Sequence, residues 1–135
     1  MDSFIIDCNV TIKWFRLKEE ASEEATVYLT KAAKEEIKIY APSIITIEFL
    51  NVLTKLNKNY LIDINECNKY LESFTKICNQ KILSIIDTQK NREEIFILAL
   101  TEKISYFDAE YLYLSKKLKF ELITYDKGLK KIANR

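Results

Sequence analysis

Four short apolar runs, which alternate with longer segments of helical periodicity, limit the possible folds of this chain more than any other feature. The runs cover residues 3–6, 37–41, 82–86 and 122–124. Short apolar runs bounded by polar residues are consistent with buried strands. Strands separated by helices of ten or more residues are typical of βαβ units with parallel strands. The pattern therefore predicts a doubly wound α/β protein with a central parallel sheet of four to five short strands flanked by helices.

The segments between these runs have the apolar spacing of helices. Expected helices cover residues 11–16, 22–37, 44–59, 63–78, 91–103, 107–118 and 127–133. Ser22, Ser43 and either Asp63 or Asn65 stand where helices should begin, and such short polar side chains accept hydrogen bonds from free N–H groups. With 135 residues, one Gly, one Pro and no repeat or linker, we expect a single domain over residues 1–135.

Charge and hydropathy narrow the setting of the protein. The net charge is +1, so binding to a nucleic acid would depend on a local basic patch. No apolar run approaches the roughly 20 residues of a membrane span. The N-terminal sequence MDSFIIDCNV has an acidic residue where a signal peptide carries positive charge. We therefore expect a cytoplasmic protein that does not enter a membrane.

The chain contains no histidine, which removes whole classes of catalysis. Ser-His-Asp and Cys-His nucleophilic sites and histidine-based acid–base ribonuclease chemistry are excluded. Cys8, Cys67 and Cys78 have no CxxC spacing, so a zinc site or a disulfide framework is not expected. Carboxylates, with or without a metal ion, remain as the chemically active groups.

Three aspartates stand at the predicted sheet edge or at the start of a helix. Asp7 directly follows the first run, Asp126 follows the last run after Tyr125, and Asp108 opens a helical segment. Ligands of open α/β sheets bind outside the carboxyl ends of the strands. Taken singly, however, each aspartate is better explained as a helix cap or turn residue. Glu48, one turn into its predicted helix, would by itself be interpreted as a solvated side chain.

Considered together, these four acids predict a cluster of like charges that a divalent cation would neutralise. Hard oxygen ligands select Mg²⁺ or Mn²⁺, and such ions commonly assist reactions at phosphate. Two other acids are not expected to belong to this cluster. Asp87 precedes Thr88-Gln89-Lys90 and is expected to form a turn, and Glu110 should point away from Asp108, since two residues turn a helix by about 200°.

Four blocks of the sequence resemble the PIN-domain ribonucleases, in particular the VapC-type toxins of type II toxin–antitoxin pairs. In order, the blocks are FIIDCNVTIKWF, YAPSIITIEFLNVL, ISYFDAEYLYLSKKL and LITYDKGLKKIA, and together they span nearly the whole chain. The resemblance implies a single PIN-like domain. It assigns the catalytic and metal-binding acids of the family to Asp7, Glu48, Asp108 and Asp126.

The resemblance also implies supporting residues, a cofactor and partners. Asn9 and Thr124 match positions that hold the acids by hydrogen bonds rather than bind the metal, whereas Tyr125 stands where the family often has a small residue. The implied activity is Mg²⁺- or Mn²⁺-dependent endonucleolytic cleavage of RNA by a homodimer that a cognate antitoxin inhibits. Lys13 and Lys127 are candidate RNA contacts, because each lies close in sequence to an acid.

Three other classes of protein are alternatives to a ribonuclease. A receiver-type signalling module would have an early acidic pair and a late lysine, and the order of acids differs here. A haloacid-dehalogenase-type phosphatase would need an aspartate at Asn9. A catalytically idle PIN-like module that only binds RNA or a protein stays open as the alternative, and a nuclease assay distinguishes it.

Overall fold

A four-stranded parallel sheet forms the centre of the structure, a computed structural model that describes residues 1–135. The strands are β1 (Ser3–Ile6), β2 (Lys38–Pro42), β3 (Leu83–Ile86) and β4 (Glu121–Ile123), in the order β3-β2-β1-β4. All three pairs are parallel, and Ile5 of β1 lies opposite Tyr40 of β2 and Leu122 of β4. The predicted α/β class and parallel sheet are confirmed.

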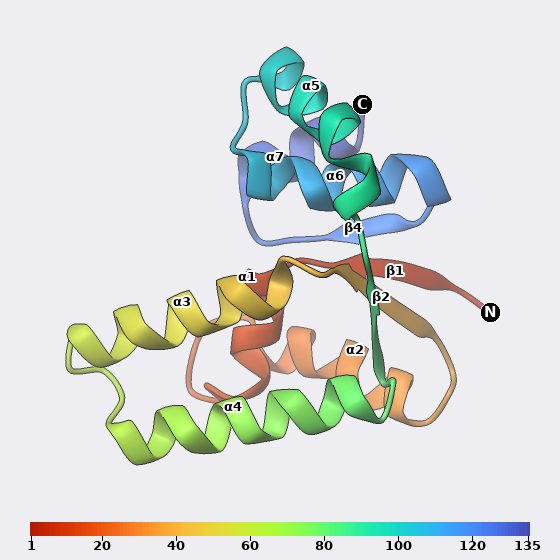
Figure 1. Cartoon of the computed structure of the whole chain (residues 1–135). Helices are drawn as coiled ribbons and strands as arrows, with labels where there is room; N and C mark the ends of the chain where they lie inside the picture. Colours follow the sequence, from red (N-terminus) through yellow and green to blue (C-terminus); the bar gives the residue numbers. More distant parts are fainter.

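Seven α-helices cover the two faces of this sheet. They are α1 (Cys8–Thr11), α2 (Ser22–Ala33), α3 (Ile45–Lys58), α4 (Ile64–Asn79), α5 (Arg92–Glu102), α6 (Tyr106–Leu118) and α7 (Lys127–Ala133), with short 3₁₀ turns η1 (Ile12–Trp14) and η2 (Gln89–Asn91). Helices α5, α6 and α7 lie on one side of the sheet, and α2, α3 and α4 lie on the other (Figure 1). Each of these helices is too short or too polar to cross a membrane.

The strand order places a topological switch point between β1 and β4. From β1 the chain continues into α1 and α2 on one face, whereas from β4 it continues into α7 on the other face (Figure 1). Chains that leave two neighbouring parallel strands in opposite directions leave a crevice beyond the carboxyl ends of those strands, which is where α/β proteins bind ligands. Asp7 follows β1 directly at this edge, and Asp126 comes three residues after the last residue of β4.

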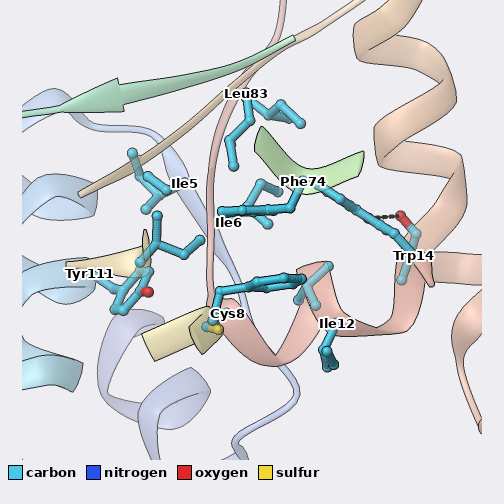
Figure 2. Close-up of a cluster of buried hydrophobic side chains, with 14 of the residues drawn as sticks. Ile5, Ile6, Cys8, Ile12, Trp14, Phe74, Leu83 and Tyr111 are labelled. Atoms are coloured by element: carbon cyan, nitrogen blue, oxygen red, sulfur yellow. Dashed lines mark hydrogen bonds between the residues drawn. The ribbon is translucent and has the colours of Figure 1, made fainter. Parts of the chain in front are cut away.

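The hydrophobic core lies on both faces of the central strand β1. Ile5 and Ile6 are completely buried, and the cluster that contains them also holds Cys8, Trp14 and Tyr111 (Figure 2). A core on both faces explains why β1 has consecutive apolar residues rather than an alternating pattern. The Trp14 indole N–H donates to the Ala25 carbonyl at 2.9 Å, so this buried polar atom is satisfied.

Helix boundaries differ from the predicted ones at two places near the N-terminus. The first helix begins at Cys8 rather than at residue 11, because the Asp7 side chain caps it directly after β1. Helix α2 ends at Ala33 rather than at residue 37. Glu35, with φ of 61°, then turns the chain in the left-handed region toward β2.

Of the predicted N-caps, the structure contains only Asp63. Asp63 accepts from the Glu66 N–H at 2.8 Å and donates its own N–H to the Glu66 carboxylate at 3.1 Å, which is a complete capping box. Ser22 is not a cap, since its hydroxyl donates to the Leu17 carbonyl and Ala21 precedes α2 in the left-handed conformation. Ser43 is not a cap either, because its N–H donates to Ile86 and extends the sheet pairing, so α3 begins later.

Candidate active site

Asp7 occupies the end of the central strand and is almost completely buried, with 5% of its surface exposed. Its backbone N–H donates to the Ile123 carbonyl at 3.0 Å, so the end of β1 stays paired with β4. One carboxylate oxygen, Oδ1, accepts from the Cys8 N–H at 2.6 Å, and the other, Oδ2, accepts from the Thr124 hydroxyl at 2.7 Å. The side chain is therefore both a helix cap and a fixed acid at the sheet edge.

Thr124 connects the acid after β1 with the acid after β4. The hydroxyl of this buried threonine donates to Asp7 and accepts from the Asp126 N–H at 3.1 Å. It also accepts from the Asn9 amide at 3.3 Å, and the Asn9 carbonyl oxygen accepts from the Tyr125 N–H at 3.2 Å. The two residues expected to support the acids thus hydrogen-bond to the segment that carries them.

Asp126 and Asp108 open the two helices that follow in the crevice region. Asp126 caps α7 by accepting from the Leu129 N–H at 2.9 Å, and its side chain is exposed. Asp108 lies in the first turn of α6, where the cap is Ser105, whose hydroxyl accepts from the Asp108 N–H at 3.0 Å. Capping accounts for one oxygen of Asp126, but it does not account for the Asp108 carboxylate.

Glu48 reaches the site from α3 on the other face of the sheet. It lies in the first turn of that helix and is partly buried. The Tyr111 hydroxyl, on α6, donates to Glu48 Oε1 at 2.6 Å. The solvated orientation that a glutamate on a helix usually has is thus excluded, because a buried residue of the opposite layer holds this side chain.

The pKa of Asp7 depends on its burial and on the charges of the neighbouring aspartates. Burial raises the pKa of Asp7 from its ordinary 3.8 to about 6, although the hydrogen bond from Thr124 opposes this rise. The negative charges of Asp108 and Asp126 raise it further. Burial, followed by the charge of Asp126, also raises the pKa of Asp108. Like charges that disfavour each other's ionised form are typical of functional clusters.

Glu48 belongs to the same set of coupled charges. Burial raises the pKa of Glu48 from 4.5 to about 7, the hydrogen bond from Tyr111 lowers it, and the charges of Asp7 and Asp108 raise it. The structure therefore brings the four predicted acids into one electrostatic cluster at the carboxyl end of the sheet. Cys8 is the thiol nearest to it, and burial raises the pKa of Cys8 to about 12, so this thiol stays neutral.

The residues present fit a hard divalent cation held partly by water. No three carboxylate or thiol side chains are placed so that they could hold a metal ion together. Mg²⁺ usually keeps several waters and is bound through only one or two carboxylates. Asp126 Oδ2 and Glu48 Oε2 accept no hydrogen bond from the protein. The oxygen donors and the coupled negative charges suit Mg²⁺ or Mn²⁺ in this water-assisted form.

Two acids outside the expected set have clear structural roles. Asp87 forms a turn, as predicted, by accepting from the Gln89 N–H at 2.9 Å. Glu110 makes no hydrogen bond to the four acids, but it is buried and accepts from the buried hydroxyl of Thr88. Its charge still contributes to the raised pKa of Glu48. No periodicity in the sequence indicated this buried pair.

The two lysines that were expected to contact RNA differ in their surroundings. Lys13 donates to the Glu20 carbonyl at 2.8 Å and to Glu19 at 3.4 Å, and its ammonium lies 5.6 Å from the ring centre of Tyr125. Lys127, the first residue of α7, is exposed directly after Asp126. The Tyr125 ring packs against Lys13, and its hydroxyl donates to the Ala21 carbonyl at 3.5 Å, so its bulk lies beside the α1–α2 connection.

Solved structures with the same arrangement come from an archaeon and a bacterium. The crystal structure of PAE2754 from Pyrobaculum aerophilum superposes with a TM-score of 0.71 at 16% identity and covers 95% of this chain and 77% of that chain. Mycobacterium tuberculosis VapC20, described as a sarcin-ricin loop cleaving toxin, superposes with a TM-score of 0.71 at 10% identity and covers 96% of this chain and 94% of that chain. At these identities the likeness concerns the fold.

Sequence comparison settles the family. No functionally curated protein matches the chain. The model of the PIN domain, by contrast, matches residues 4–135, which include all four strands except Ser3 of β1, all seven helices and the four clustered acids. The resemblance seen in the sequence and the four-stranded parallel sheet agree with this match. The chain belongs to the PIN-domain family.

Proposed function

We propose that the protein is an endoribonuclease that depends on Mg²⁺ or Mn²⁺ and hydrolyses phosphodiester bonds of RNA. The observation that carries the proposal is the convergence of Asp7, Glu48, Asp108 and Asp126 at the switch point, where the neighbouring negative charges raise the pKa values of Asp7, Glu48 and Asp108. Histidine is absent from the whole chain. Carboxylates that hold a divalent cation are therefore the chemistry that this site supports best.

The roles of the acids follow from their hydrogen bonds. Asp126 and Glu48 each have one oxygen engaged by the protein and one oxygen left for a ligand. Asp7 has a hydrogen bond on each oxygen, and both retain further lone pairs. We assign one or two of the four acids to direct contact with the ion and the others to its bound waters. When bound, the ion would activate a water for in-line attack and neutralise charge on the phosphate.

Thr124 and Asn9 keep this arrangement rigid. The Thr124 hydroxyl fixes the distance between the end of β1 and the start of α7 by bonding to both Asp7 and the Asp126 backbone. Metal sites depend strongly on residues of this kind, which orient the ligands without touching the ion. We expect Lys127 to bind the phosphate backbone of the RNA. Lys13 would bind the same backbone once RNA displaces Glu19 from its ammonium group.

The biological role that we propose is that of the toxin in a toxin–antitoxin pair. Support comes from the family and from the superposition on VapC20, whose description names it a toxin that cleaves the sarcin-ricin loop. We infer a homodimer in the cytoplasm that is inhibited by a cognate antitoxin. Co-expression with the product of an adjacent small reading frame should yield a stable complex that cleaves no RNA. Two proteins that elute separately would contradict the pairing.

Cleavage of RNA is the direct test of the proposed activity. The wild type should cleave a structured RNA set in Mg²⁺ or Mn²⁺, and EDTA should abolish cleavage. Asp7→Asn and Asp126→Asn should each reduce the rate by at least about 100-fold, since each removes a charge from the cation site. Asp87→Asn is the matched control, because Asp87 follows β3 and only forms a turn.

The result also decides the alternative. Cleavage that persists in EDTA, or in both site variants, would rule out the metal mechanism. Binding of RNA without cleavage across the whole set would instead show the idle binding module. The idle module stays in the test because no three carboxylate or thiol side chains are close enough together to hold an ion.

A further inference from the structure

Tyr111 is a polar residue in the centre of the core whose hydroxyl has one hydrogen-bond acceptor. No part of its surface is exposed, and it belongs to the cluster that contains Ile5, Ile6 and Cys8 (Figure 2). The hydroxyl donates to Glu48 Oε1 at 2.6 Å. Leaving a buried hydroxyl without a partner costs on the order of 1–3 kcal/mol. The two side chains are therefore held together strongly, although 63 residues separate them in the sequence.

The helix that carries Tyr111 also carries one of the clustered acids. Asp108 lies three residues earlier on α6, and residues three apart lie on the same face of a helix. A second contact also restrains the rotation of α6, because Glu110 on this helix accepts a hydrogen bond from Thr88, which follows β3. One helix thus places the Asp108 carboxylate and the donor to Glu48 toward the same end of the sheet.

Glu48 has no other anchor in the protein. It projects from α3, in the layer opposite α6 (Figure 1), and the hydrogen-bond pattern gives it Tyr111 as its partner. Without that donor a glutamate, which has three side-chain torsions, would be free to turn toward solvent away from the charges of Asp7 and Asp108. Like charges make the clustered rotamer unfavourable.

We propose that Tyr111 is a positioning residue that holds Glu48 in the acidic cluster, with Oε1 bonded to Tyr111 and Oε2 left to bind the divalent cation or its water. The inference rests on the proposed metal-dependent function and extends it to a residue of the core. It explains why a fully buried tyrosine, rather than phenylalanine, occupies this position of α6.

The test measures binding of Mn²⁺ to the full chain by electron paramagnetic resonance, without any substrate. Tyr111→Phe keeps the ring and removes only the hydroxyl. We expect it to weaken Mn²⁺ binding by at least about tenfold, the lower end of the effect known for residues that orient metal ligands. Tyr113→Phe is the matched control, because Tyr113 also lies on α6 and donates to a glutamate, Glu94 of α5, whose charge is not among those that act on the clustered acids. Its binding should stay within about twofold of the wild type.

A double variant separates positioning from a general effect on the fold. In a Glu48→Gln background, Tyr111→Phe should cause no further loss of Mn²⁺ affinity, because the group that it positions is already gone. A loss of equal size in both backgrounds would overturn the inference, and so would equal affinity of the wild type and Tyr111→Phe. A wild type that binds no Mn²⁺ would overturn the proposed metal dependence and this inference together. The two failures are therefore distinguishable.

Discussion

Asp7 illustrates how a single residue can stabilise local structure and still be unfavourable for the fold. Its carboxylate caps α1 and accepts the Thr124 hydroxyl, which are favourable contacts. Burial nevertheless raises its pKa to about 6, and the neighbouring acids add to the rise. The carboxylate still predominates at neutral pH, but its ionisation costs more free energy in the fold than in water. A residue of this kind is expected where function requires charge in a place that folding alone would leave neutral.

The pH dependence of stability should reveal this penalty. Because the folded pKa of Asp7 is raised above 3.8, the native state binds the proton more tightly than the unfolded chain, and stability falls as pH rises from about 4 to 6. Asp7→Asn removes this titration, so in EDTA its free energy of unfolding relative to that of the wild type should rise by about 3 kcal/mol between about pH 3 and about pH 7.5. Below about pH 3 the carboxyl is protonated in both states, and the difference in stability between the two proteins should no longer change with pH.

Urea unfolding of the wild type and of Asp7→Asn over this pH range measures the difference. Asp87→Asn serves again as the control, since Asp87 is exposed and forms a turn outside the cluster. A difference between wild type and Asp7→Asn that does not change with pH would show that the charge of Asp7 is not the cause.

Among the helices, α4 has the start that is most clearly determined by neighbouring residues in the sequence. Asp63 and Glu66 exchange hydrogen bonds between side chain and backbone at its first turn. By contrast, no side chain accepts a capping hydrogen bond at the start of α2 or of α3. The stability of α4 should therefore depend on its cap more than that of its neighbours does.

Asp63→Ala should destabilise the protein by about 1 kcal/mol, because the Glu66 N–H in the first turn loses its acceptor. Asp63→Asn should keep most of the stability, since the amide oxygen can still accept. Glu72→Ala on the same helix is the control, as Glu72 forms only an exposed ion pair with Lys76 at 3.6 Å. Thermal unfolding monitored by circular dichroism compares the variants, and an equal loss from Asp63→Ala and Glu72→Ala would contradict the capping argument.

On the scale of the whole molecule, β1 connects the core with the acidic cluster. It is the one strand with neighbours on both sides that is directly followed by an acid of the cluster. Ile5 has no exposed surface and lies opposite residues of β2 and β4. Damage to the packing of this strand should therefore weaken the entire fold and not only one layer.

Ile5→Ala should lower the free energy of unfolding by about 2–5 kcal/mol, through lost burial and the cavity that remains. The matched control is Ile97→Ala on α5, where 62% of the side chain is exposed, and its effect should stay within about 0.5 kcal/mol. Denaturant unfolding measures both. A loss at Ile97 as large as that at Ile5 would show that α5 is covered by another molecule in solution.

Local features of the sequence were sufficient for the class of the fold and for much of the candidate site. Short apolar runs between helical segments predicted the parallel sheet, since strand and helix periods are local properties. Asp7 and Asp126 were predicted at the sheet edge because an acid that closely follows a strand lies near the strand's end whatever the neighbouring strands are. Asp63 was one of two caps predicted for its helix, and local chemistry could indicate it because its partner is only three residues away.

Only the tertiary structure decided which distant segments contact one another. Whether Glu48 faces solvent or the cluster depends on Tyr111, and whether Glu110 is buried depends on Thr88. Neither pairing has a signature in the sequence, because the order of the strands and the rotation of α6 determine which side chains meet. The sequence alone thus determined which acids lie near the sheet edge, and the packing of α3 and α6 across that edge decided how they are held.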